Sequence, residues 1–221
     1  MSLLHSSPVI EYPESDGKPM GETDLHRDWM IRILELLKHR YRGERVYVSS
    51  DLLLYYQEGR PQKFVVPDVF VVSDCDPRRR TTFKTWVEGR GPDVVWEVTS
   101  RSTRRIDEQL KPQVYAEIGV KEYFLYDPTS EYLLPPLQGF RLTDRGYEEI
   151  QPEPTVGLQP ATLLCRELGL LHHLEAGELV ITDRQTGQRL LTGEEAAREE
   201  LLRLRALLEG RDPSDGGAAG S

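Results

Sequence analysis

Hydrophobic residues occur in short runs with the composition of β-strands, separated by stretches in which they recur at helical spacing. The helical spacing extends from Thr23 to about Arg40, with Thr23 placed to cap a helix, and returns over residues 102–119. The remaining runs are rich in Val, Phe and Tyr and predict strands. These runs lie at 46–50, 63–72, 92–100 and 121–128. Because the second helix connects the last two strands, we expect those strands to pair in parallel.

Beyond Asp127 the pattern changes to short strands and turns, which we expect to add antiparallel strands to the same sheet. Pro112 interrupts the helix over 102–119 and is expected to kink or split it. Residues 194–209 carry acid–base pairs four apart and predict a helix that either docks on the body or pairs with another subunit. The resulting division is an extended lead-in at 1–20, one domain at 21–193, a helix at 194–210 and a disordered tail at 211–221.

Composition narrows the class of protein. A chain of 221 residues with 38% hydrophobic residues is long enough to bury the core of one large domain. It has no apolar run of about 18 residues, so no membrane span is expected, and its N-terminus lacks a secretory pattern. Cys75 and Cys165 are far apart, which argues against thiolate zinc sites and a disulfide framework. We therefore expect a cytoplasmic protein.

Charge is unevenly distributed. The net charge of −9 argues against a protein covered in positive charge for non-specific nucleic-acid binding. Residues 78–111 nevertheless carry nine basic and five acidic residues, a local net charge of +4. A solvated arginine-rich loop explains that excess equally well on charge alone. Its overlap with the carboxylates described next favours phosphate binding, for which the candidates are Arg78, Arg79, Arg80, Arg101, Arg104 and Arg105.

Two carboxylates interrupt otherwise apolar strands. Asp68 lies in VVPDVFVV and Glu97 in PDVVWEVTS. Desolvating a charge is costly unless a partner or a metal compensates it, and neighbouring strands would bring the two carboxylates within a few ångströms. Oxygen ligands of this kind favour Mg²⁺ or Mn²⁺, and Lys111 can supply an ammonium that positions or deprotonates a water. The alternative is two strand-edge acids paired with arginines, plus a surface lysine.

The order of these groups resembles a known superfamily. Pro–Asp in one strand, Glu in the next and a lysine close behind are similar to the PD-(D/E)XK nucleases, which have the restriction-endonuclease-like fold. Within that superfamily the chain resembles the Uma-two family over roughly residues 20–190. The matching stretches include YVSSDLLLYYQEG at 47–59, VVPDVFVV at 65–72, WVEGRGPDVVWEVTSRSTRRID at 86–107 and LKPQVYAEIGVKEYFLYDP at 110–128.

The resemblance implies an α/β mixed-sheet core with flanking helices and added antiparallel strands, and a Mg²⁺- or Mn²⁺-dependent endonuclease acting on DNA. Asp68 and Glu97 would bind the metal, helped by the main-chain carbonyl of Val98. In the superfamily the lysine lies two residues after the Glu, and in this chain that position is occupied by Thr99. In the Uma-two pattern that lysine is displaced to the following helix, which points to Lys111 as the third catalytic residue.

Accessory roles and rival functions stay open at this point. An acid from the first helix adds a metal ligand in many nucleases of this fold, which suggests Glu22. The alternative is that Glu22 only stabilises the helix N-terminus through the helix dipole. Asp107 and Tyr115, each four residues from Lys111, are accessory candidates or members of a solvent-facing stripe. His172 and His173 are expected to be structural or exposed. The rivals to an endonuclease are a catalytically inactive binding module and a hydrolase of another phosphate substrate, and a homodimer is reasonable.

Overall fold

The computed structural model describes residues 10–15, 23–153 and 161–209. Its centre is a six-stranded sheet in the order β1-β4-β6-β7-β8-β9. These strands are β1 (Val46–Ser50), β4 (Val69–Ser73), β6 (Val94–Val98), β7 (Glu122–Tyr126), β8 (Leu137–Thr143) and β9 (Gly146–Glu149). β6 and β7 pair in parallel, and all other neighbours are antiparallel. The expected parallel crossover and the mixed α/β class are confirmed.

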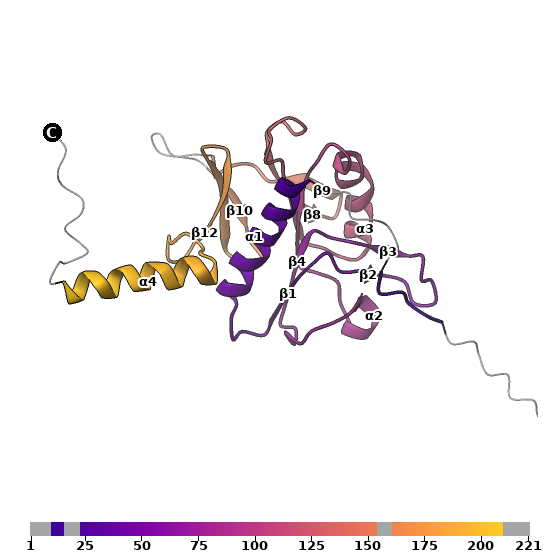
Figure 1. Ribbon diagram of the computed structural model, residues 1–221. Coiled ribbons are helices and arrows are strands. Elements are labelled where there is room, and N and C mark those ends of the chain that lie inside the picture. The colour runs from indigo at the N-terminus through magenta and orange to yellow at the C-terminus, as the bar shows by residue number, and fades with distance from the viewer. Residues whose placement is uncertain (1–9, 16–22, 154–160, 210–221) are drawn as a thin grey trace, which may run out of the picture.

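Further elements cover both faces of this sheet and give three layers (Figure 1). Helix α1 (Asp24–Arg40) and a second sheet pack on one face, where Ile33, Trp96 and Ile181 share a core. The other face carries α3 (Lys111–Glu117) and a third sheet, where Phe83 and Tyr115 share a second core with the central strands. The second sheet is β10 (Leu163–Cys165), β11 (Leu170–Glu175) and β12 (Glu178–Asp183); the third is β2 (Leu54–Tyr55), β3 (Phe64–Val65) and β5 (Phe83–Lys84), which α2 (Thr85–Glu88) follows.

Two strand predictions are wrong in detail. The run at 63–72 divides into β3 and β4, because Pro67 has no amide to donate to a ladder. The amide of Asp51 instead donates to the carbonyls of Pro67 and Asp68, at 3.1 and 3.3 Å, so Asp68 precedes β4 and does not lie within it. In the late region β8 and β9 extend the central sheet as expected, but β10, β11 and β12 form a sheet of their own.

The helix after β6 is split near Pro112, as expected. Its first part, η1 (Ile106–Leu110), has π-helical geometry, and α3 follows directly. The amide of Lys111 donates to the carbonyl of Ile106, five residues back, and Pro112 lies in the first turn of α3, where a missing amide costs no helical bond. Each part of this segment contributes one buried side chain, Asp107 from η1 and Tyr115 from α3.

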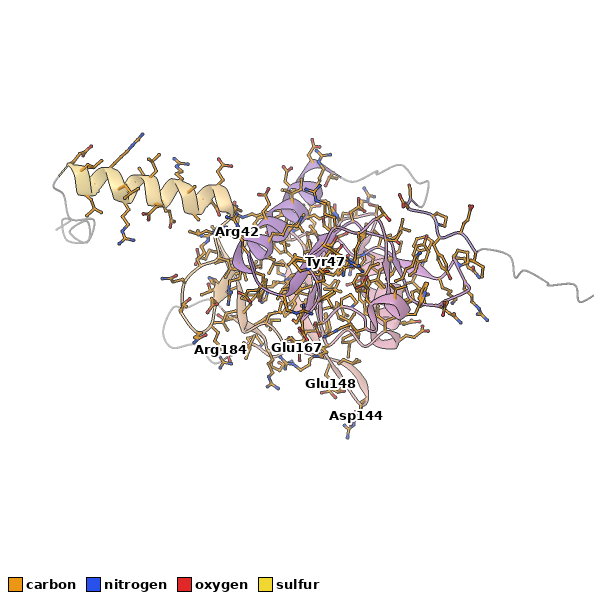
Figure 2. All side chains as sticks on the ribbon, turned by 90° about the horizontal axis from the view of Figure 1, so that it is seen from below. Arg42, Tyr47, Asp144, Glu148, Glu167 and Arg184 are labelled. Atoms are coloured by element: carbon orange, nitrogen blue, oxygen red, sulfur yellow. The ribbon has the colours of Figure 1, made fainter. Side chains whose placement is uncertain are left out.

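Helix α4 (Gly193–Leu208) begins with a capping box between Thr192 and Glu195 and then leaves the body (Figure 1, Figure 2). An ion pair of 2.9 Å between Arg32 and Glu195 ties its first turn to α1. None of its residues is buried. Docking on the body is therefore limited to the first turn. None of the described helices is long and apolar enough to cross a membrane.

His172 belongs to the core. Trp96 donates its indole N–H to Nε2 of His172 at 3.1 Å, and the imidazole stacks on Phe124. Burial lowers the pKa of His172 to about 3. The unfolded chain binds this proton near pH 6.5, whereas the folded chain does not, so stability falls as the pH drops from about 6.5 toward 3.

We expect this one histidine to cost about 2 kcal/mol of unfolding free energy between pH 7 and pH 5. His172→Gln retains an acceptor for Trp96. It should reduce the change in unfolding free energy between pH 7 and pH 5 by that amount. Urea unfolding of both proteins at the two pH values measures it. Equal pH dependence in the two proteins would show that His172 is not held neutral.

Candidate functional site

The strand register brings the two predicted carboxylates together. Val69 of β4 lies opposite Trp96 of β6, which places Asp68 opposite Glu97 where β4 begins and β6 ends. The amide of Asp68 donates to Oε2 of Glu97 at 3.3 Å, and the amide of Val98 donates to Oδ2 of Asp68 at 2.7 Å. Both carboxylates are buried. The arrangement differs from that of two independent strand-edge acids paired with arginines.

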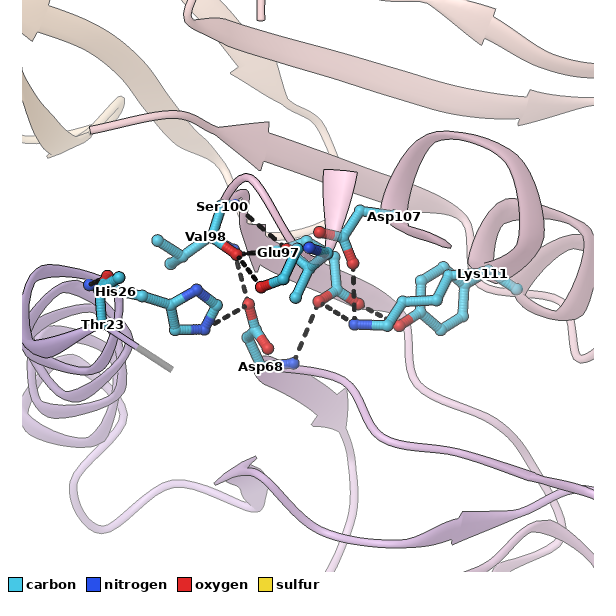
Figure 3. A network of polar contacts seen from close by, with 11 residues as sticks. Thr23, His26, Asp68, Glu97, Val98, Ser100, Asp107 and Lys111 are labelled. Carbon is cyan, nitrogen blue, oxygen red and sulfur yellow. Dashed lines mark hydrogen bonds and ion pairs between the residues drawn. The ribbon is translucent and has the colours of Figure 1, made fainter. Parts of the chain in front are cut away.

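Three side chains from η1 and α3 complete the network (Figure 3). The Nζ atom of Lys111 lies 2.6 Å from Oε2 of Glu97 and 3.1 Å from Oδ1 of Asp107. The hydroxyl of Tyr115 donates to Oε1 of Glu97. Asp107 and Tyr115 are buried, so neither belongs to a solvent-facing stripe. The split at Pro112 therefore does not misplace the lysine.

His26 is the site residue that sequence reasoning did not select. Its Nε2 atom lies 3.4 Å from Oδ2 of Asp68, and the residue is only 1% exposed. The available signal was its position on the buried stripe of α1 with Trp29, Met30 and Ile33, where a titratable group needs a partner. Glu22, the acid proposed for this helix, lies outside the described residues.

Electrostatics keep Lys111 charged. Burial lowers the pKa of its ammonium, but the carboxylates of Glu97, Asp68 and Asp107 outweigh burial and raise that pKa. An ammonium with a raised pKa favours the protonated form, which agrees better with the expected positioning of a water or neutralisation of a phosphate than with deprotonation of a water. In the structure this cation is paired with the carboxylates of Glu97 and Asp107.

The two carboxylates that face each other have opposite pKa shifts. Burial raises the pKa of Glu97 well above its usual value, with Asp68 and Asp107 adding to the effect against Lys111. Burial also raises the pKa of Asp68, but Lys111, His26 and the amide of Val98 outweigh it and lower that pKa. Of the two carboxylates, Asp68 therefore favours the ionised form and Glu97 the protonated form.

The donor set fits a hard divalent cation. Three carboxylates, from Asp68, Glu97 and Asp107, face the one ammonium of Lys111, so the ionised cluster carries excess negative charge. Mg²⁺ binds through one or two carboxylates and completes its octahedron with water. Within the described ranges no three His, Cys, Asp or Glu side chains form a metal cage by themselves. Asp68 and Glu97 would hold the ion, and the carbonyl of Val98 as a third ligand stays a prediction.

The arginine candidates divide into two groups. Arg78, Arg79 and Arg80 follow the far end of β4, where Ser73 lies roughly 17 Å from Asp68 at about 3.3 Å per residue. The side chain of Arg80 is only 4% exposed. It donates to both carboxylate oxygens of Glu88, and its guanidinium lies 4.1 Å from the centre of the Tyr47 ring. This trio therefore lies away from the carboxylate pair, and its expected contact with phosphates of the substrate stays untested.

The second arginine group lies at the site. Arg101, Arg104 and Arg105 follow β6 at the end that carries Glu97, and all three are exposed. Arg104 forms a 3.1 Å ion pair with Glu108, one turn along. Such an exposed pair is weak enough to exchange for a phosphate. This group remains the predicted phosphate-binding surface.

A mixed sheet with two facing carboxylates and a lysine at one end of its central strands is the arrangement expected of the restriction-endonuclease-like class. The chain belongs to the Uma2 family, whose model, described as "Putative restriction endonuclease", matches residues 3–171. A crystal structure described as a "putative nuclease belonging to DUF820" from Anabaena variabilis aligns with a TM-score of 0.46 and 16% identity, over 64% of this chain and 75% of that chain. No curated protein matches the chain.

Proposed function

We propose that the protein is a Mg²⁺- or Mn²⁺-dependent endonuclease that hydrolyses phosphodiester bonds of DNA. The observation that carries the proposal is the buried contact of Asp68 with Glu97, closed on one side by the ammonium of Lys111. Membership of a family described as "Putative restriction endonuclease" supports the same proposal. DNA is the proposed partner, and the free, buried Cys75 and Cys165 agree with a cytoplasmic location.

Each residue of the site has a distinct role in this proposal. A bound divalent ion would supply a Lewis acid and a water of lowered pKa. Asp68 and Glu97 hold the ion, and His26 and the amide of Val98 fix the orientation of Asp68. Lys111 presents a permanent positive charge to the scissile phosphate and its developing negative charge.

Supercoiled plasmid provides the test. With Mn²⁺ present, the wild-type protein is expected to nick the plasmid, and Glu97→Ala and Lys111→Ala are expected to lose that activity. A chelator should abolish the wild-type activity as well. Cleavage that survives both substitutions would exclude the assigned residues.

The rival binding module has one observation in its favour. Thr99 occupies the position of the superfamily lysine and is buried, so that position carries no charge. In this reading the carboxylates and Lys111 form a structural ion-pair cluster. Calorimetric titration with Mn²⁺ separates the two functions, because a structural cluster gives no metal binding that depends on Asp68 and Glu97.

We further propose that α4 joins two copies of the chain. Leucines on this helix are exposed, among them Leu201 and Leu204 at 48% and Leu208 at 88%. With Ala197, these three follow the alternating four–three spacing of a coiled-coil seam. Glu200 and Arg205 flank the seam five residues apart, which places opposite charges side by side in a parallel pair. A helix of about 24 Å gives a weak dimer that depends on protein concentration.

Sedimentation measures this association. Wild-type protein is expected to dimerise with rising concentration, and the double change Leu201→Glu with Leu204→Glu should leave it monomeric. Leu202→Glu lies off the seam, adds the same charge and is the matched control. A monomeric wild type at every concentration, or equal loss in the control, contradicts the pairing.

A further inference from the structure

A cavity of about 410 Å³ adjoins the carboxylates on the side of His26. That volume is within the usual range of small-ligand sites, roughly 300–1,000 Å³. Its walls come from the start of α1, the end of β6 with the turn after it, and the loop between β7 and β8. The residues that line the cavity include His26, Thr99, Ser100, Arg101, Thr129 and Tyr132.

The side chain of Thr99 has an unmet hydrogen bond that a bound ligand would satisfy. Thr99 is only 2% exposed, and its Oγ1 atom has no hydrogen-bond partner among the described residues. A buried hydroxyl without a partner is costly, and such a group in a native structure calls for an explanation. Thr99 is also two residues from Glu97 along the chain, so a group bound to it lies next to the carboxylates.

Two further features of the cavity lining favour an anion. Arg101 lines the cavity and is exposed. The first turn of α1, a helix of 17 residues capped by Thr23, reaches the same cavity. First-turn amides lack acceptors within the helix, and the helix dipole places positive potential there. These groups suit a phosphate.

Other parts of the cavity lining suit a flat apolar group. Pro128 and Tyr132, from the loop between β7 and β8, supply them. Asp127, which is fully buried, accepts the amides of Thr129 at 2.9 Å and Tyr132 at 2.5 Å, so the loop that carries the ring is fixed in place. Aromatic rings in such positions stack nucleobases without regard to sequence. The cavity is also too large for a phosphate alone.

We propose that this cavity binds one unpaired nucleotide of the substrate, with the phosphate at Thr99 and Arg101 and the base against Tyr132. The inference rests on the proposed function, since it takes the substrate to be DNA. A base enters such a pocket only when it is out of the duplex. The substrate class is therefore DNA with an unpaired nucleotide beside the cleaved bond, such as single-stranded or frayed ends.

Calorimetric titration of the full chain with deoxyadenosine monophosphate, in the presence of a chelator, tests the pocket without any catalysis. Saturable binding is expected, tighter than that of inorganic phosphate. Thr99→Val and Arg101→Gln should each weaken it at least about fivefold, and Tyr132→Ala should weaken the nucleotide but not phosphate. Arg79→Gln, an exposed arginine that lines a different cavity, is the control and should bind like the wild type.

Thr99→Val also controls for folding, because removing a buried hydroxyl without a partner should leave the melting temperature unchanged or higher. No saturable nucleotide binding, unchanged affinity in Thr99→Val and Arg101→Gln, or phosphate binding as tight as nucleotide binding would each overturn the proposal. If the protein binds the nucleotide but does not cleave plasmid, the proposed hydrolytic function is refuted and nucleotide binding in the cavity is supported. If it cleaves plasmid but does not bind the nucleotide, only the proposed nucleotide binding is refuted.

Discussion

Glu97→Gln is expected to lower Mn²⁺-dependent plasmid cleavage by at least about 100-fold while the protein stays folded. The carboxylate of Glu97 is a predicted metal ligand, and an amide of the same shape removes its charge. The fold survives because Tyr115 can still donate to the amide oxygen and Lys111 keeps its 3.1 Å contact with Asp107. The unfolding free energy should change by no more than about 2 kcal/mol.

Glu122→Gln is the matched control for this change. Glu122 is a buried strand glutamate on β7, but it bonds Arg141 at 2.7 Å and the amide of Glu167 at 3.0 Å instead of facing the carboxylate pair. We expect this variant to lose stability and to keep its specific activity. Full cleavage by Glu97→Gln, or equal losses of activity in the two variants, would remove Glu97 from the mechanism.

Lys111→Met is expected to destabilise the protein by about 3–5 kcal/mol at pH 7, because it leaves buried carboxylates without their shared cation. The loss should shrink as the pH falls. Burial and neighbouring carboxylates raise the pKa of Glu97 and of Asp107, so both bind protons readily once the ammonium is gone. Urea unfolding at pH 7 and pH 5 measures the effect, and Mn²⁺ should restore part of the lost stability.

Lys121→Met provides the comparison for Lys111. The ammonium of Lys121 also faces two carboxylates, those of Asp93 at 3.3 Å and Glu167 at 2.6 Å, but its side chain is 50% exposed. Solvent screens such a pair, so its loss should cost no more than about 1 kcal/mol. If Lys111→Met is as mild as Lys121→Met, the cluster is not the tightly coupled network that its distances indicate.

The facing carboxylates were predictable because a charge among Val, Phe and Trp needs a partner wherever the strands lie. The pairing of Asp107 with Lys111 followed from their four-residue spacing, which survives in the π-helical turn. The displaced lysine itself came from the family resemblance, since Thr99 at the usual position gives no signal. The local sequence therefore predicted that the candidate site residues lie close to one pair of strands.

Features set by tertiary packing were not predictable. His26 reaches Asp68 because α1 crosses the end of the sheet, and no local pattern fixes where a helix crosses. The guanidinium of Arg80 is covered by Glu88 and by the ring of Tyr47, so its positive charge is paired with Glu88 and does not face the solvent. Short antiparallel strands do not encode which sheet they join, which is why β10, β11 and β12 were assigned to the central sheet.

The most direct measurement is the anomalous X-ray signal of crystals soaked with Mn²⁺ at the concentration that supports cleavage. A metal site at the carboxylate pair predicts a peak in contact with both Asp68 and Glu97, absent from crystals of Glu97→Gln. A map without a peak between these carboxylates, from a protein that cleaves plasmid under the same conditions, would contradict the proposed metal centre.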